Sequence, residues 1–329
     1  MNDHASEKKT QCKTDVHDVS IYRKQLPSIA ETIIASCEDK ACYTYIDYDP
    51  IPSNNSVIEI ISRFREILFP GYFDREKLDP SNLNYKIGQS VSVFFDILAE
   101  QITNSIKRDC LRYDKECSNC NVRGHSISLE ILKSIPALRR ILATDVHAAY
   151  EGDPAAKSHD EIIFSYPGIF AITVYRLAHM LFKYDVPLFP RILTEYAHGI
   201  TGIDIHPGAD IGKRFVIDHG TGIVIGESAA IGKNVRIYQG VTLGAHSLPA
   251  DAGDLYRGEK RHPTIEDDVI IYSGATILGG TTIIGARSVI GGNVWITKSV
   301  PQDTKVILEE PKLIFKGPSK KNFTSFNEL

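Results

Sequence analysis

The chain has 329 residues, of which 43% are hydrophobic and 24% are charged, and its formal net charge is −4. This length suits about two domains, and the composition is that of a globular protein rather than a disordered one. The mildly acidic balance argues against a nucleic-acid-coating protein, and no apolar run reaches the roughly 18 residues of a membrane span. Residues 1–15 lack the apolar core of a secretory signal, so we expect a cytoplasmic protein that binds neither nucleic acid nor membrane.

The first 200 residues have helical periodicity. Apolar residues recur at steps of three or four, typical of amphipathic helices, along four stretches: 57–68, 91–106, 129–141 and 169–177. Pro136 is expected to kink or break the third of these helices. We expect a mobile N-terminus over residues 1–20 and an all-helical domain over residues 21–200.

The cysteines do not indicate a secreted protein, because six in a chain of this length are too few for a disulfide scaffold. Three of them and a histidine lie close together in the sequence: Cys110, Cys117, Cys120 and His125. The C-x-x-C spacing suits zinc or redox chemistry, and His125 would complete a set of four zinc ligands. We favour the alternative of reduced thiols near the end of a helix.

From about residue 200 the pattern becomes a repeat of six. An aliphatic residue returns every sixth position, with short slips, at Ile205, Ile211, Ile217, Ile225, Ile231, Ile237, Leu243, Ile265, Ile271, Ile277, Ile284, Ile290 and Ile296. This period fits neither an amphipathic helix nor a hairpin sheet, and it is typical of a hexapeptide parallel β-helix. An isoleucine-rich sandwich is the alternative, which so many repeats in phase disfavour. We place the β-helix at residues 201–300 and a C-terminal tail at 301–329.

Departures from the repeat are where we expect the functional residues, because a regular coil has no site. The longest departure, residues 245–263, is predicted to be an ejected loop. It carries basic and imidazole side chains, at His246, Arg257, Lys260, Arg261 and His262. A loop of this length in a compact fold is commonly functional.

Two shorter insertions place acidic residues and histidines inside the repeat. Asp204 and His219 are separated by nearly one coil if a coil takes about 18 residues, which predicts a carboxylate close to an imidazole. A carboxylate stabilises the charged imidazole after proton capture, so this pair suits a general base for an alcohol. For His206 we prefer a hydrogen-bonded turn residue.

Six ordered motifs between about residues 148 and 303 resemble the serine O-acetyltransferase family, the hexapeptide-repeat acyltransferases of cysteine biosynthesis. The motifs are Glu-Gly-Asp-Pro at 151–154, Tyr-Arg-Leu-Ala-His at 175–179, Gly-Ile-Asp-Ile-His-Pro at 202–207, Ile-Asp-His-Gly-Thr-Gly-Ile at 217–223, Gly-Val-Thr-Leu-Gly at 240–244 and Lys-Arg-His-Pro at 260–263. The resemblance implies an α+β protein: an N-terminal all-helical domain, then a left-handed parallel β-helix with a C-terminal tail.

The resemblance implies transfer of an acetyl group from acetyl-CoA to the hydroxyl of L-serine, which gives O-acetylserine. His219 would be the general base and Asp204 would support it. The hydroxyl would attack the thioester directly, so neither an enzyme thiol nor a metal is required. Backbone N–H groups near Gly244 are our candidates for stabilising the oxyanion.

The resemblance also assigns the substrate contacts. Asp153 and Asp218 would bind the ammonium group of serine. Arg261 would bind its carboxylate, and His262 would help to hold it; opposite charges on the site and the amino acid agree with this. The acetyl-CoA candidates combine small residues, which let backbone approach the cofactor, with a lysine for its phosphates: Gly244, Ser273, Gly274, Gly291, Gly292 and Lys298.

The resemblance implies partners as well. The family forms homotrimers, or dimers of trimers, with sites between subunits, and L-cysteine would be a feedback inhibitor. The C-terminal tail would dock an O-acetylserine sulfhydrylase. Three features depart from the family: a longer loop over residues 245–260, Leu308-Glu309-Glu310-Pro311 in place of an Ala-Gly-x-Pro turn, and a terminal Leu329 in place of isoleucine.

Three other functions stay open at this point. One is a hexapeptide acetyltransferase that acts on homoserine or a sugar. Another is a zinc-dependent β-helical carbonic anhydrase, with His206, His219 and His262 as ligands, although Asp204 and the basic loop suit an acyl acceptor better. The third is a non-catalytic partner of a sulfhydrylase, and intact candidate residues argue against it.

Overall fold

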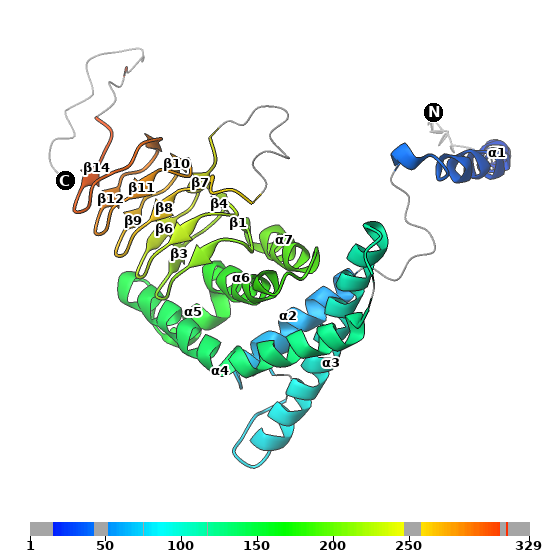
Figure 1. Ribbon diagram of the computed structural model, residues 1–329, viewed down its shortest axis with the longest axis horizontal. Helices are drawn as coiled ribbons and strands as arrows, with labels where there is room; N and C mark the ends of the chain where they lie inside the picture. The colour runs from blue at the N-terminus through cyan, green and yellow to red at the C-terminus, as the bar shows by residue number, and fades with distance from the viewer. Residues whose placement is uncertain are drawn as a thin grey trace, which may run out of the picture. The chain divides into compact units, whose positions relative to one another are not determined.

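The computed structural model describes residues 16–42, 52–74, 76–116, 118–246, 258–309 and residue 314 (Figure 1). The chain divides into two compact units, Met1–Asp49 and Pro50–Leu329, and each is described by itself. Within the described residues, the helices are all too short or too polar to cross a membrane.

The first unit contains helix α1 (Val16–Ser36) and the short 3-10 helix η1 (Lys40–Cys42). Helix α1 begins inside the stretch of residues 1–20 that the sequence predicted to be mobile. Pro27 lies within α1.

The second unit begins with helices that form the support for the β-helix: α2 (Asn54–Leu68), α3 (Leu83–Arg112), α4 (Cys120–Gly152), α5 (His159–Ser165), α6 (Pro167–Lys183) and α7 (Phe189–Thr201). Serines mark two of the starts: the Ser53 and Ser158 hydroxyls accept hydrogen bonds from the N–H groups of Ser56 and Glu161. Proline at the first position of α6 suits a helix start, since the N–H it lacks has no partner there.

Most of the predicted apolar positions of these helices are buried or partly buried, although Leu129 is 45% exposed, and α2, α3 and α4 pack together around the buried ones. One expectation was too strong: Pro136 does not break its helix, because α4 continues from Cys120 to Gly152. Buried Ile131, Ile135, Leu138 and Leu142 flank the proline on both sides. Both halves of α4 are therefore held against the same core, which offsets the backbone hydrogen bond that proline removes.

The β-helix consists of short parallel strands in three sheets (Figure 1). Sheet 1 has the order β1 (Ile203–Ile205), β4 (Ile223–Ile225), β7 (Thr242–Gly244), β10 (Thr276–Leu278) and β13 (Trp295–Ile296). Sheet 2 has the order β11 (Ile283–Ile284), β8 (Thr264–Ile265), β5 (Ala230–Ile231) and β2 (Asp210–Ile211). Sheet 3 has the order β14 (Lys305–Val306), β12 (Val289–Ile290), β9 (Ile270–Ile271), β6 (Arg236–Tyr238) and β3 (Val216–Asp218).

The inward side chains confirm the repeat of six. Every aliphatic residue that the sequence assigned to the interior of the coil, from Ile205 to Ile296, is buried. Strand pairing places equivalent residues of successive coils above one another, as in Ile217 with Ile237 and Ile237 with Ile271. The α+β architecture, helices followed by a left-handed parallel β-helix, is therefore confirmed.

The turns of the coil differ in length, whereas the predicted pair of Asp204 and His219 required a coil of about 18 residues. The first turn, from Ile203 to its partner Ile223, is longer than the next, from Val224 to its partner Thr242. Thr242 then pairs with Thr276, so the long segment between β7 and β8 leaves the coil and rejoins it in register. At the other end, β14 pairs with β12, and the coil therefore extends into residues 301–329, where the sequence predicted only a tail.

A buried ion pair joins the helices to the first coil. Asp145 of α4 is fully buried and accepts a hydrogen bond of 2.7 Å from the Arg176 guanidinium of α6. Its other oxygen accepts from the Phe215 N–H at 2.9 Å, and Arg176 also donates to the carbonyls of Ile211 and Gly212. Burial raises the pKa of Asp145 to about 6, while the guanidinium and the N–H group act in the opposite direction.

Replacing this buried carboxylate tests its role in stability. Asp145→Asn leaves the Arg176 charge buried without a counter-ion, so we expect the free energy of unfolding to fall by about 3 kcal/mol. Urea denaturation followed by circular dichroism measures this. The control is Glu130→Gln, which breaks an exposed pair with Lys133 and should cost below about 0.5 kcal/mol. Equal losses in the two variants would contradict the assignment.

Candidate active site

The first group of candidate residues lies where the C-terminal end of α4 meets strand β3. Asp153 follows α4 directly, and its carboxylate accepts a hydrogen bond of 2.5 Å from the Tyr166 hydroxyl. Asp218 ends β3, and Arg236 of β6 donates to it at 3.4 Å and to the carbonyl of Ala148 at 3.0 Å. The arginine thus connects the acidic residue of the coil to helix α4.

These contacts fix the charges of the group. The Tyr166 hydroxyl is the largest cause that lowers the pKa of Asp153, and the Ala155 N–H and the charges of Arg236 and His219 add to it. The same hydrogen bond raises the pKa of Tyr166 to about 12. Asp153 is therefore a carboxylate at neutral pH, able to attract a cationic group.

Gly152 leaves room for the Arg236 guanidinium. A Cβ atom at that position would lie 1.5 Å from an Arg236 nitrogen. Any larger residue at 152 would therefore displace the arginine from Asp218. The glycine of the Glu-Gly-Asp-Pro motif has this local steric reason.

His219 lies beside Asp218 and points toward solvent. Its side chain is 74% exposed, and its Nε2 atom lies 3.8 Å from Asp218 Oδ1. The backbone of His219 is left-handed, with φ of +57°, and Gly220 follows with φ of +97°. A left-handed residue recurs at the turns of this coil, as at Arg214, Asn234 and Asp268. The turn presents the imidazole at the corner between sheets 3 and 1.

The second group of candidates lies at the corner between sheets 1 and 2. The Ser228 hydroxyl accepts hydrogen bonds from the N–H groups of Arg261 (2.8 Å) and His262 (3.1 Å). The Ser228 N–H donates to His262 Nδ1 at 3.1 Å. Arg261 contacts the Glu227 carboxylate. Gly226 makes space for the imidazole, because a Cβ atom there would lie 2.1 Å from His262 Nε2.

His262 is a neutral histidine in this arrangement. It is 8% exposed, and burial lowers its pKa to about 4, with the neighbouring Arg261 charge acting in the same direction. Because Nδ1 accepts the Ser228 N–H, the ring carries its proton on Nε2. His262 is therefore a hydrogen-bond donor rather than a cation.

Asp204 does not occupy the place that the sequence predicted. No hydrogen bond or ion pair joins it to His219 among the described residues; instead it accepts from Arg191 of α7 at 3.3 Å. The reason is the length of the first coil, which pairs Asp204 with Val224 rather than with a residue near His219. The expected close pair of carboxylate and imidazole is therefore not formed within this chain.

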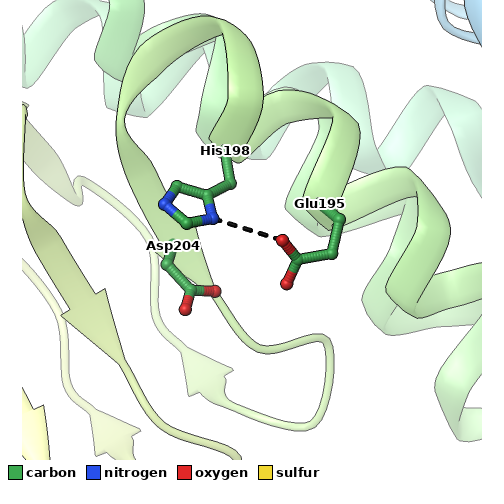
Figure 2. Close-up of side chains that lie close together, drawn as sticks. All are labelled: Glu195, His198 and Asp204. Atoms are coloured by element: carbon green, nitrogen blue, oxygen red, sulfur yellow. Dashed lines mark hydrogen bonds and ion pairs between the residues drawn. The ribbon is translucent and has the colours of Figure 1, made fainter.

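Figure 2 shows the surroundings of Asp204, with the side chains of Glu195 and His198 from α7 beside it. His198 Nδ1 lies 3.2 Å from a Glu195 oxygen, and potential ligand atoms of the three residues lie within 4.8 Å of one another. Arg191 contacts both carboxylates. A guanidinium already balances their charge, so a metal ion at this place would have to displace it.

The two groups of candidates lie at opposite ends of the strands of sheet 1. His219 precedes β4, and Gly226 to Ser228 follow it directly. A strand of three residues spans about 10 Å, so β4 separates the imidazole of His219 from Arg261 and His262. Within one chain, the structure does not bring the proposed base and the proposed carboxylate-binding arginine together.

The cofactor candidates follow the corner that carries His219. Strand pairing places Ser273 and Gly292 at the positions equivalent to His219 on later coils, with Gly274 and Gly291 beside them. Gly274 has φ of +70°, a backbone that favours glycine. A long ligand along this corner would therefore end next to the imidazole.

Two further cofactor candidates lie elsewhere. Gly244 ends β7 in sheet 1, paired with Leu278, and Lys298 is exposed after β13. Neither takes part in the corner that carries His219. Their assignment to acetyl-CoA stays a prediction.

The predictions for the histidines of the coil have clear outcomes. His206 Nδ1 accepts the Gly208 N–H at 3.0 Å, which is the turn role that we preferred. Among the described residues of one chain, His206, His219 and His262 do not form a group with metal-ligand distances.

The structure describes three of the four members of the cysteine cluster, Cys110, Cys120 and His125. Cys117 lies outside the described residues, and the sulfurs of Cys110 and Cys120 are 4.0 Å apart, too far for a disulfide bond. His125 Nδ1 contacts the carbonyl of Asn121 at 2.7 Å. Because Cys117 is not described, the zinc site stays a prediction.

Sequence reasoning missed four residues that shape the two groups: Tyr166, Arg236, Glu227 and Ser228. Each occupies a solvent-facing or turn position whose residue type the repeat does not restrict. Tyr166 precedes Pro167, which marks only a helix start. Only the fold shows that these side chains face the candidates.

Comparison with known proteins places the chain in a family. No family model matches it. It is 48% identical over 256 residues to the plasmid serine acetyltransferase of Synechococcus elongatus, covering 77% of this chain and 80% of that protein. It is 44% identical over 168 residues to the serine acetyltransferase of Bacillus licheniformis, covering 51% of this chain and 74% of the relative.

Solved structures agree. Entamoeba histolytica serine acetyltransferase 1 in complex with L-cysteine has a TM-score of 0.67 and 37% identity, covering 82% of this chain and 93% of that one. Neisseria gonorrhoeae serine acetyltransferase in complex with serine has a TM-score of 0.50 and 25% identity, covering 77% and 97%. The parallel coil and these relatives thus define a hexapeptide-repeat acyltransferase. More narrowly, the chain belongs to the serine acetyltransferase family.

The depressed pKa of His262 predicts a pH effect on stability. An unfolded histidine titrates near 6.5, so as the pH falls from about 6.5 to 4 the unfolded state binds the proton first. The folded state therefore loses stability over this window. We expect His262→Gln to lose less stability than the unmodified protein between pH 7 and pH 4.5, as measured by urea denaturation. His125→Gln, at an exposed histidine, is the control, and identical pH profiles for both variants would refute the prediction.

Proposed function

We propose that this chain transfers the acetyl group of acetyl-CoA to the hydroxyl of L-serine, and that O-acetylserine and CoA are the products. The observation that carries this proposal is the group at the end of β3, where two carboxylates, Asp153 and Asp218, flank an exposed imidazole. The membership in the serine acetyltransferase family supports the choice of acceptor and donor. We expect the protein to work in the cytoplasm and to supply O-acetylserine for cysteine biosynthesis.

His219 is the proposed general base. Its imidazole is exposed beside the Asp218 carboxylate, so a substrate hydroxyl can approach it. As the serine oxygen bonds to the thioester carbon, His219 takes the hydroxyl proton. When the tetrahedral intermediate collapses, the carbon–sulfur bond breaks and the proton passes to the CoA thiolate. The enzyme is unchanged at the end, and the step uses neither a metal nor an enzyme thiol.

The charges of the two groups match those of an amino acid. The carboxylates of Asp153 and Asp218 suit the serine ammonium group, although Arg236 already offsets part of the Asp218 charge. Arg261 suits the carboxylate and would exchange its contact with Glu227 for the substrate. Neutral His262 donates from Nε2. In our proposal Asp204 has no direct contact with the base of its own chain, because its partner there is Arg191.

The separation of the two groups supports a site between chains. Because β4 lies between His219 and Arg261, a complete site needs the His219 corner of one chain to face the Arg261 corner of another. We therefore propose a homotrimer, or a dimer of trimers, in which each interface carries one site. Ser273, Gly274, Gly291 and Gly292 would hold acetyl-CoA along that interface, with Gly244 as the oxyanion donor and Lys298 at the phosphates.

Two regulatory partners complete the proposal. The Entamoeba histolytica relative binds L-cysteine and the Neisseria gonorrhoeae relative binds serine, which supports L-cysteine as a feedback inhibitor here. We also propose that the C-terminal tail, ending at Leu329, docks an O-acetylserine sulfhydrylase. Leu329 lies outside the described residues.

Acceptor choice and base are tested together by the release of CoA thiol from acetyl-CoA. We expect release with L-serine that exceeds release with homoserine, a sugar or no acceptor. His219→Ala should lower the rate by about a hundredfold or more, because general-base catalysis is lost, whereas His125→Gln should leave it unchanged. Faster release with homoserine or a sugar would show that serine is not the preferred acceptor. No release with any acceptor would favour a non-catalytic partner of a sulfhydrylase.

The proposed interface site is tested by mixing two inactive variants. His219→Ala and Arg261→Ala each remove one side of the site, so each variant alone should be inactive. Co-expression at equal levels should restore about a quarter of the sites if trimers form at random and each site takes one residue from each of two chains. A tag on each variant allows mixed trimers to be purified and counted. Mixed trimers without activity would show that both residues act within one chain.

A further inference from the structure

A groove lies between helices α4, α5 and the C-terminal end of α2. Its volume is about 670 Å³, within the range of about 300–1,000 Å³ that is usual for small-molecule sites. Its apolar lining is formed by Leu68, Phe69, Pro136, Ala143, Val146 and Ile163. Four cationic or ionisable side chains complete it: Arg139, Arg140, His147 and His159.

Helical spacing explains why these side chains share one groove. On α4, residues 136, 139, 140, 143 and 147 recur at steps of three and four, so they occupy one side of the helix. Leu68 and Val146 of the apolar lining are buried, while both arginines and both histidines are exposed. The groove therefore has an apolar floor and a positively charged rim.

The two arginines have no partners in the described part of the chain. Neither the Arg139 nor the Arg140 guanidinium makes a hydrogen bond or an ion pair there. The other arginines of this region differ: Arg214 pairs with Glu151 at 2.6 Å and Arg176 with Asp145.

The two histidines form a pair on the same rim. His147 Nδ1 lies 3.5 Å from His159 Nε2, and His147 Nε2 lies 3.0 Å from Glu151. Tyr150 packs against the His159 ring, with 4.5 Å between the ring centroids. Since Glu151 also pairs with Arg214, its charge is shared and does not neutralise the rim.

The acidic residues of α5 already have hydrogen-bond partners of their own. Asp160 accepts from the Tyr72 hydroxyl at 2.6 Å, and Glu161 accepts from the Lys157 N–H at 2.8 Å. Neither contacts an arginine of the groove. The positive charge of Arg139 and Arg140 is therefore available to a ligand.

We propose that this groove binds an organic oxyanion with an apolar body, such as an aryl or short acyl group that carries a phosphate or carboxylate. The planar guanidinium forks suit bidentate contacts with such a group. The imidazole pair can add a further N–H donor, and the apolar floor can hold the body of the ligand. The inference does not depend on the proposed acetyl transfer, because the groove contains none of the residues assigned to it.

Isothermal titration calorimetry on the full chain tests the site with four probes: phenyl phosphate, benzoate, inorganic phosphate and phenol. We expect phenyl phosphate or benzoate to bind more tightly than inorganic phosphate, because the floor adds apolar contact. We expect phenol, which lacks the charge, to bind most weakly. The order of the first two distinguishes a phosphate ligand from a carboxylate ligand.

The variant Arg139→Gln/Arg140→Gln should weaken binding of the best probe at least about tenfold, as expected when a charge-assisted contact is lost. Lys133→Gln removes a charge from α4 outside the groove and should change the affinity less than about twofold. Serine-dependent CoA release and circular dichroism should be unchanged in both variants, which shows that they fold. No saturable binding up to about 5 mM, or equal affinities in the two variants, would overturn the proposal.

Discussion

The structure depends on one constraint, the stacking of aliphatic side chains inside a parallel coil. Each inward residue lies over its equivalent in the coil below, as Ile271 lies over Ile237, and backbone hydrogen bonds between coils hold this register. Residues at the corners are therefore also arranged in columns. The column that begins at His219 continues through Ser273 and Gly292, and Gly226, Ser228 and His262 belong to another corner. The core decides which polar residues can meet.

The helical half of the protein takes its position from the first coil. The Asp145–Arg176 pair and its contacts to Phe215 and Gly212 fix α4 and α6 against the coil. As a result, Asp153 at the end of α4 lies near Asp218, although the two are far apart in the sequence. A buried ion pair adds little net stability compared with apolar packing; its value here is that it determines one orientation.

Much of this architecture follows from the sequence. Every aliphatic residue that the repeat of six assigned to the interior is buried, because the parallel coils stack these side chains on one another. The length of each turn could not be derived, since short slips at the corners leave the inward pattern intact. That uncertainty explains the wrong expectation for Asp204 and His219: the first turn is longer than the repeat implies, which moves the aspartate toward α7. Arg236 and Ser228 were missed for a related reason, because outward positions of the repeat accept many residue types. Pro136 shows the opposite case, in which packing overrides a local preference.

The segment between β7 and β8 departs after Gly244 and returns at Thr264 to the same register, since Thr242 pairs with Thr276 as it pairs with Val224 one coil earlier. The register of the coil therefore does not depend on the number of residues between β7 and β8. A longer segment there costs little stability, because the entropy cost of closing a loop rises only slowly with its length. Arg261 and His262 are fixed by Ser228 at the point of return, not by the path that precedes it. Insertions here can reshape the approach to the site over evolutionary time while the scaffold and its binding groups stay in place.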